Sequence, residues 1–195
     1  MVNAAWKRNT WIVYFVLLAG GIVALDLWSK EAVFELLEVV SVGDPPEVAS
    51  QKPFVVIEDY FWLEANYNYG AFSGWFSGHT GYLAAVSVIA AAVLAGLFVF
   101  HVVRHAQPCA LYVTALALLL GGTIGNLYDR AMLRAVRDWI RWFYVSSDGK
   151  HHVWPNFNVA DSAIVGGVGC LVLLELIRWR KEKRESRAGA ETQRE

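Results

Sequence analysis

Two carboxylates in the second half of the chain, Asp138 and Asp161, are the residues whose type and spacing could do chemistry. Both lie in apolar surroundings, and the 22 residues between them allow the chain to fold back and bring the two segments together. Two carboxylates in close reach cannot both ionise easily, so they share one proton. That state supplies a base to activate water and an acid to protonate a leaving amine, which is the chemistry of aspartic proteolysis.

Polar residues, the two aspartates among them, lie at or near the ends of long apolar segments, where polar groups are costly in a membrane and usually have a role. If the apolar segments cross a membrane in alternating directions, connectivity alone places these residues at one face and near one depth. They are Asp26, Asn68, Ser73, Asn126, Asp129, Arg130, Asp138, Asn158 and Asp161.

Most of these residues also have a purely structural interpretation. Asp26 and Lys30 have the i,i+4 spacing of an ion pair on a helix, and we interpret both as structural supports. Asp129 and Arg130 are adjacent and could form an ion pair at a helix end. Asn158 precedes an apolar segment, where asparagine is favoured as an N-cap.

Histidine, serine and cysteine do not form a second candidate site. The five histidines lie in three different loops, so a zinc site is not expected. Ser29 has only Lys30 nearby as a base, which is a weak nucleophile arrangement. The two cysteines lie inside apolar segments and are interpreted as small buried hydrophobic residues. We therefore expect neither a metal nor a cofactor.

The composition indicates a membrane protein with a single domain. In 195 residues the hydrophobic fraction is 56%, the charged fraction 18% and the mean hydropathy +0.36, whereas soluble domains average about 45–50% apolar and about 25% charged residues. The net charge of -1 provides no basic field for nucleic acid. The predicted fold class is mainly α: residues 1–195 form one four-transmembrane-helix bundle, with spans at about 10–27, 82–103, 107–128 and 157–178.

The distribution of Lys and Arg predicts the orientation of these spans. Of the 17 Lys and Arg residues, ten lie in the two tails and the connection between the second and third spans, and seven lie in the two other loops. This bias favours cytoplasmic termini and a site at the outer face. The first outer loop then covers residues 28–80, with a short surface helix at 31–40 and a small sheet from 54–68. The second outer loop, 129–156, is interfacial, and a basic, partly disordered cytoplasmic tail covers 179–195.

Two other function classes are compatible with polar residues in a membrane. A small proton-coupled transporter or channel would need them at mid-span and in both leaflets, whereas here the inner halves of the spans are nearly free of charge. A scaffold protein without chemistry would not require two carboxylates.

Four short motifs, in order on the four spans, resemble those of the lipoprotein signal peptidase family, also called signal peptidase II. They are Asp26-Leu-Trp-Ser-Lys30, Asn68-Tyr-Gly-Ala-Phe-Ser73, Gly121-Gly-Thr-Ile-Gly-Asn-Leu-Tyr-Asp-Arg130 and Phe157-Asn-Val-Ala-Asp161. The chain departs from the family pattern at Arg137, where an apolar residue is expected, and at an insertion over 146–152 that includes a turn. The second motif is one small residue shorter, and the first outer loop is longer than the family minimum.

The resemblance implies a function and a role for each residue of the motifs. Members of this family are aspartic endopeptidases of the bacterial cytoplasmic (inner) membrane that remove signal peptides from diacylglyceryl-modified prolipoproteins, cleaving just before the lipid-bearing cysteine. By resemblance the sheet rests on the membrane, membrane lipids and the prolipoprotein are the partners, and the protein is a monomer. The resemblance implies that Asp138 and Asp161 are catalytic, that Asn68, Gly70, Asn126, Arg130 and Asn158 bind substrate or support the dyad, and that Asp26, Lys30 and Asp129 are structural supports.

Overall fold

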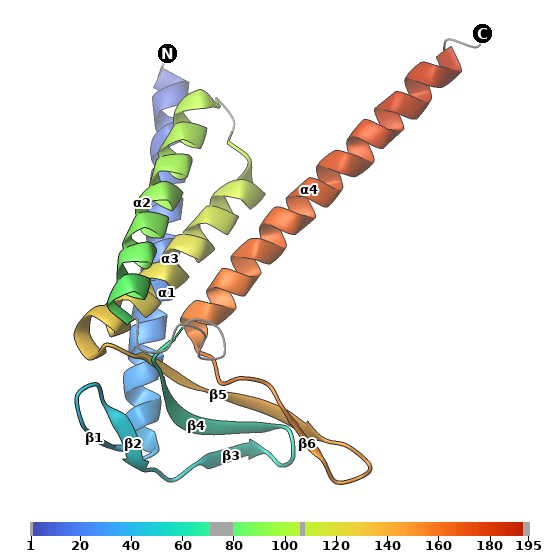
Figure 1. The fold of residues 1–195 in the computed structure, drawn as a ribbon. Coiled ribbons are helices and arrows are strands. Elements are labelled where there is room, and N and C mark those ends of the chain that lie inside the picture. The colour runs from blue at the N-terminus through green and yellow to red at the C-terminus, as the bar shows by residue number, and fades with distance from the viewer. Residues whose placement is uncertain (1, 71–79, 106–107, 193–195) are drawn as a thin grey trace.

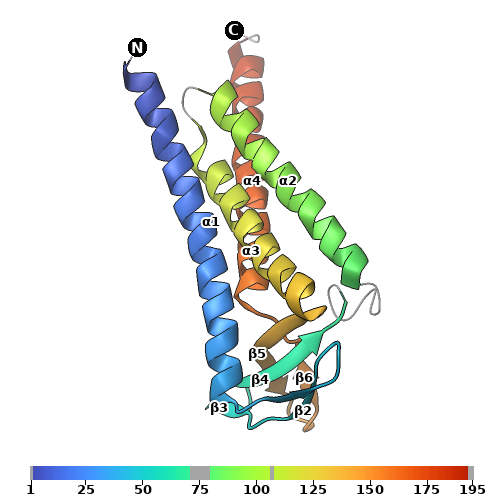
Figure 2. The same cartoon turned by 90° about the vertical axis from the view of Figure 1, so that its left-hand side faces the viewer.

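The computed structural model describes residues 2–70, 80–105 and 108–192, which form four long helices and two small antiparallel sheets (Figure 1). All four helices are long and apolar enough to cross a membrane. Both termini lie at the end of the bundle opposite the sheets (Figures 1 and 2). The helices are α1 (Val2–Leu36), α2 (Thr80–Arg104), α3 (Ala110–Leu133) and α4 (Val159–Thr192).

The centre of the bundle is α3, which packs against each of the other three helices. Its side chains Val113 and Leu116 lie in a buried cluster with Phe15 of α1 and Phe98 of α2, whose rings stack with centroids 3.7 Å apart. Most other apolar side chains of α1, α2 and α4 point outward. That arrangement suits lipid, because helices satisfy their own backbone hydrogen bonds and can expose apolar faces to hydrocarbon.

Close helix packing at the sheet end of α3 depends on glycine. A Cβ atom at Gly121 would lie 2.8 Å from the carbonyl oxygen of Ala19 in α1, and one at Gly125 would lie 2.5 Å from Oδ2 of Asp26. Small residues of this kind let helix backbones approach in a membrane. They bring the polar ends of α1 and α3 into direct contact.

The sheet that concerns the site has four strands in the order β3 (Phe54–Ile57), β4 (Phe61–Asn68), β5 (Val136–Val145) and β6 (His151–Val153). A separate hairpin is formed by β1 (Val40–Val42) and β2 (Glu47–Ser50). In the β4–β5 pair, Asn66 lies opposite Asp138 and Asn68 opposite Val136, beyond an irregularity after Leu63. The sheet thereby joins the first connection of the chain to the third.

The structure confirms the predicted fold class and the strands in residues 54–68, and it corrects three local predictions. No separate surface helix occupies residues 31–40, because α1 continues without a break to Leu36. The segment predicted as an outer loop at 129–156 contains the end of α3 and strands β5 and β6. The basic tail is not disordered: α4 continues to Thr192, and pairs such as Arg178–Glu175 (2.8 Å) along one helix favour this extension.

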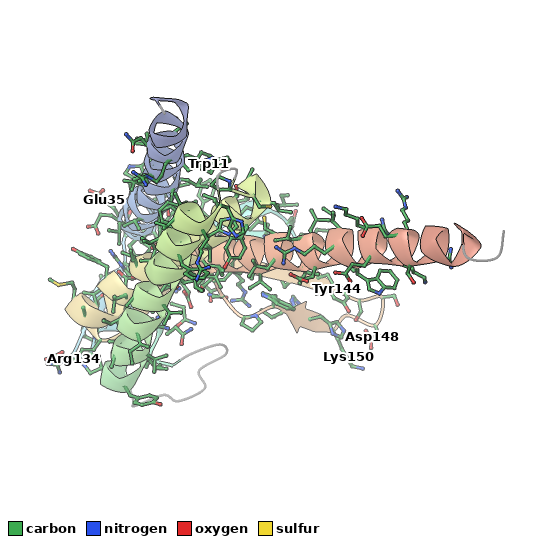
Figure 3. All side chains as sticks on the ribbon, turned by 90° about the horizontal axis from the view of Figure 1, so that it is seen from above. Trp11, Glu35, Arg134, Tyr144, Asp148 and Lys150 are labelled. Carbon is green, nitrogen blue, oxygen red and sulfur yellow. The ribbon has the colours of Figure 1, made fainter. Side chains whose placement is uncertain are left out.

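The predicted turn in residues 146–152 connects β5 to β6, with Gly149 in the left-handed region (φ 79°). Trp142, Tyr144 and Trp154 of this hairpin are exposed. Figure 3, viewed along the bundle, shows Tyr144 and the residues of the turn on the side toward which α4 leans. Figure 1 shows from the side that α4 leans in the direction in which the β5–β6 hairpin extends.

Candidate active site

Asp138 lies near the start of β5, with only 2% of its surface exposed. Its Oδ2 accepts a hydrogen bond from Nδ2 of Asn68 at the end of β4 (3.1 Å). Its Oδ1 accepts one from Nδ2 of Asn158, just before α4 (2.8 Å). Two side-chain amides from different elements therefore fix the orientation of this carboxyl group.

Asp161 lies in the first turn of α4 and forms a reciprocal cap with Asn158. The backbone N–H of Asp161 donates to Oδ1 of Asn158 (2.9 Å), and the backbone N–H of Asn158 donates to Oδ2 of Asp161 (3.2 Å). This confirms the N-cap interpretation of Asn158 and has the geometry of a capping box. Because Asn158 also bonds to Asp138, one residue holds both carboxylates in place.

Asn126 of α3 connects this pair to a lysine. Its Nδ2 donates to Oδ1 of Asp161 (2.7 Å), while its Oδ1 accepts from Nζ of Lys30 (3.2 Å) and from Nδ2 of Asn158 (3.0 Å). Lysine can only donate, so the side-chain oxygen of Asn126 must face Lys30 and its NH2 group must face Asp161. The amide orientation is thus determined by chemistry.

Lys30 is fully buried, donates hydrogen bonds to Asp26 and Asn126, and forms a second ion pair with Asp129. Its Nζ lies 2.7 Å from Oδ2 of Asp26 and 3.2 Å from Oδ2 of Asp129, in addition to Asn126. Oδ1 of Asp26 accepts from the backbone N–H of Ala160 (2.9 Å), which holds the start of α4 against α1. Buried charges require such pairing to be tolerated at all.

Arg130 and Gly70 form the described edge of the site. Nη2 of half-buried Arg130 donates to the carbonyl oxygen of Gly70 (3.3 Å), and the N–H of Gly70 donates to Oδ1 of Asn68 (3.0 Å). Residues 71–73 of the second motif, including Ser73, lie outside the described residues.

The electrostatic environment of Asp138 favours its neutral form. Burial, followed by the negative charge of Asp161, raises the pKa of Asp138 to about 8, against the opposing effect of its bonds to Asn68 and Asn158 and the charge of Lys30. A carboxyl group that is protonated at neutral pH beside a second carboxylate is suited to act as a general acid.

All ten residues predicted from the sequence lie in one connected set of contacts at the sheet end of the bundle. The fully or nearly buried polar side chains of the described residues are all in this region, with none in the middle of the bundle. Among the same residues, no group of three His, Cys, Asp or Glu is arranged to hold a metal ion.

The sequence reasoning missed Arg137 and Glu31 as members of this set. Nη1 of Arg137 lies 2.8 Å from Oε2 of Glu31, and Nη2 lies 2.9 Å from Oδ1 of Asp129. The signal for Arg137 was its position, because a charged residue stood beside a candidate catalytic aspartate where an apolar one was expected. Glu31 gave no comparable signal.

The four membrane-length helices and the buried polar cluster define a polytopic membrane enzyme, and solved structures of that class have the same fold. A bacterial membrane enzyme determined at 2.3 Å by the in meso method superposes with a TM-score of 0.66 and 25% identity, covering 85% of this chain and 88% of that one. A second bacterial membrane enzyme, at 1.9 Å, gives a TM-score of 0.62, again with 25% identity, covering 85% of this chain and 94% of that one.

Sequence relatives then specify the family. The family model for signal peptidase (SPase) II matches residues 18–177. A lipoprotein signal peptidase of Rhodopirellula baltica is 41% identical, covering 88% of this chain and 74% of the relative, and one of Xanthomonas campestris is 33% identical, covering 91% and 97%. The chain therefore belongs to the signal peptidase II family and is a membrane hydrolase of that type.

Proposed function

We propose that the protein removes signal peptides from diacylglyceryl-modified prolipoproteins, cutting just before the lipid-bearing cysteine, with Asp138 and Asp161 as its catalytic residues. The names of its relatives support the substrate class. The observation that carries the assignment of the dyad is that Asn158 bonds to both carboxyl groups at once. This arrangement leaves two carboxyl groups in fixed, neighbouring positions.

In the proposed mechanism Asp161 is the base and Asp138 the acid. Asp161 lies in the first turn of α4, where the helix dipole and two N–H donors act for its ionised form against the effect of burial. Asp161 takes a proton from water, and the resulting hydroxide attacks the carbonyl carbon of the scissile peptide. Asp138 donates a hydrogen bond to the oxygen on which negative charge develops. The tetrahedral species then collapses, the C–N bond breaks, and the proton held by Asp161 passes to the leaving nitrogen.

The remaining residues would position the substrate and the dyad. Asn68 and Asn158 orient Asp138, Asn126 orients Asp161, and Arg130 holds the chain at Gly70 beside them. The buried pairs of Lys30 with Asp26 and Asp129 support this layer from within the bundle and do not touch the substrate.

We further propose that both termini are cytoplasmic and that the site faces outward from the bacterial cytoplasmic membrane. The excess of Lys and Arg in the tails and the second connection supports this orientation. The common location of both termini, opposite the sheets, agrees with it (Figure 1). The proposed partners are the lipidated prolipoprotein and membrane lipids, with no nucleic acid, and the proposed state is a monomer.

The test is a cleavage assay in detergent micelles with a prolipoprotein supplied with and without its diacylglyceryl group. We expect wild type to cut only the lipidated form, and D138N and D161N to lose about 100- to 10,000-fold in rate, the range of general acid–base catalysis. Asp148→Asn is the matched control, because Asp148 is an exposed residue of the hairpin turn and pairs with Lys150 and Ser146 of the same turn. A folded D138N or D161N protein with full activity would remove the dyad assignment.

A further inference from the structure

Arg137 is a buried arginine beside the proposed acid Asp138. Its side chain is only 10% exposed and lies on strand β5, which contacts α1 and α3. Burial acts to lower the pKa of Arg137, but its bonds and charge interactions with Asp129 and Glu31 outweigh burial and raise it, so the side chain stays charged. A charge in this position is stable only because its partners are close.

The side chain joins three elements. Nε and Nη2 donate to Oδ1 of Asp129 in α3 (3.2 and 2.9 Å), and Nη1 donates to Oε2 of Glu31 in α1 (2.8 Å). The guanidinium also lies 6.0 Å from the ring centroid of Phe34. Arginine contacts two carboxylates in different directions here, which the single ammonium of lysine cannot reproduce in the same geometry.

The backbone of the same residue is held from both sides. The N–H of Arg137 donates to Oδ2 of Asp129 (3.0 Å), and its carbonyl oxygen accepts from Nδ2 of Asn158 (3.2 Å). That Nδ2 group also donates to Oδ1 of Asp138. Neighbouring side chains on a strand point to opposite faces. The guanidinium therefore anchors one face of β5 while Asp138 occupies the other.

Arg137 also balances the charge behind the dyad. Asp26 and Asp129 are fully buried, and their cationic partners are Lys30 and Arg137. Without Arg137, Lys30 alone would face two buried carboxylates. The region next to the dyad would then gain one uncompensated negative charge.

We propose that Arg137, with Glu31 and Asp129, is a positioning residue that fixes the start of β5 and thereby the placement of Asp138. The proposal rests on the function proposed above. A displacement of about 1 Å in a catalytic group costs about 100-fold in rate, so a residue that never touches the substrate can control turnover.

The test compares four variants in the same cleavage assay. Arg137→Met keeps an unbranched apolar stem without the charge, Arg137→Lys keeps the charge without the fork, and Glu31→Gln removes the charge of the exposed partner. The matched control is Arg141→Met, because Arg141 is on the same strand and pairs with Glu64, outside the dyad network. We expect R137M to lower kcat about 10- to 100-fold with KM unchanged and R137K to recover part of this loss. E31Q should lower kcat by a smaller factor than R137M, because Asp129 still holds the guanidinium, and R141M should change kcat less than threefold.

A second readout does not depend on substrate. The infrared band of protonated Asp138, identified by its absence in D138N, is followed against pH. The charged groups around Asp138 are Lys30 from α1, Arg130 from α3 and Asp161 from α4, while Asn68 and Asn158 are neutral. Loss of the positive charge in R137M should move the titration midpoint of this band upward by about half a pH unit to one pH unit.

The outcomes separate the two proposals. If R137M matches R141M in kcat and matches wild type in band midpoint, the positioning role is wrong. If wild type cleaves nothing but the midpoint still shifts in R137K, which keeps the charge and lacks the fork, the proposed function fails and the positioning of Asp138 stands. If R137M does not fold, R137K decides: kcat lowered at constant KM supports the proposal, and wild-type kcat overturns it.

Discussion

Replacing Lys30 by methionine tests whether the buried ion pairs behind the dyad hold the bundle together. Nζ of Lys30 lies 2.7 Å from Asp26 and 3.2 Å from Asp129, and all three side chains are fully buried. In K30M, Asp129 keeps Arg137, but Asp26 loses the cation of Lys30 and retains one backbone N–H. Leaving a buried charge without its partner costs about 3–5 kcal/mol.

The expected size of the effect follows from the length of the chain. For proteins of about 150–250 residues, 1 kcal/mol moves the midpoint of thermal unfolding by about 2–4 °C, so K30M should unfold about 6–20 °C below wild type. The unfolding can be followed in detergent by the fluorescence of the nine tryptophans. Lys52→Met is the control, because Lys52 pairs with Glu38 on the surface and both side chains are mostly exposed.

A double variant distinguishes charge pairing from simple loss of packing. In K30M with D26N, the uncompensated carboxylate is removed as well, and the remaining pair of Asp129 and Arg137 is balanced. We therefore expect the double variant to be less destabilised than the sum of K30M and D26N. Strict additivity, or a K30M protein as stable as wild type, would refute the reasoning.

Three further predictions concern the same layer of the molecule. The pKa of Asp138 lies at about 8 in the folded protein, whereas the ordinary value is 3.8, so between these pH values the folded protein holds a proton that the unfolded chain has released. The free energy of unfolding should therefore fall as pH rises from about 4 to about 8. The pH dependence of the unfolding midpoint should be flatter in D138N. Asn158→Ser keeps a capping oxygen and Asn158→Ala does not, so the alanine variant should be about 1 kcal/mol less stable by denaturant titration while both lose activity. Gly125→Ala places a Cβ atom 2.5 Å from Asp26 and should lower the unfolding midpoint, whereas Gly169→Ala on open helix surface should not.

The sequence was sufficient for the parts of the site that depend on local spacing. Asp26 and Lys30 are one helical turn apart, and Asn158 and Asp161 have the spacing of a cap, so each pair could be recognised along the chain. The prediction that the four motifs lie together at one face of the membrane followed from the number and alternating direction of the spans. These predictions needed no knowledge of how distant segments pack.

The remainder depends on contacts between distant segments. The pair of Arg137 with Glu31 joins residues 106 positions apart, and it requires the register of β5 against both α1 and α3. The pairing of Asn66 with Asp138 depends on an irregularity in β4 that shifts the register of the sheet. The extension of α4 to Thr192 is an exception, because it reflects local charge pairs within one helix, which a count of basic residues does not detect.

Asn158 caps α4 and also orients Asp138, and this combination has a consequence for drug resistance. A compound that binds Asp138, Asp161 and Asn158 contacts residues that hold the helix end together as well as the proposed reaction centre. A mutation that abolishes the drug contact at these residues also weakens the enzyme, so we expect few resistance mutations at the proposed reaction centre to leave an active protein.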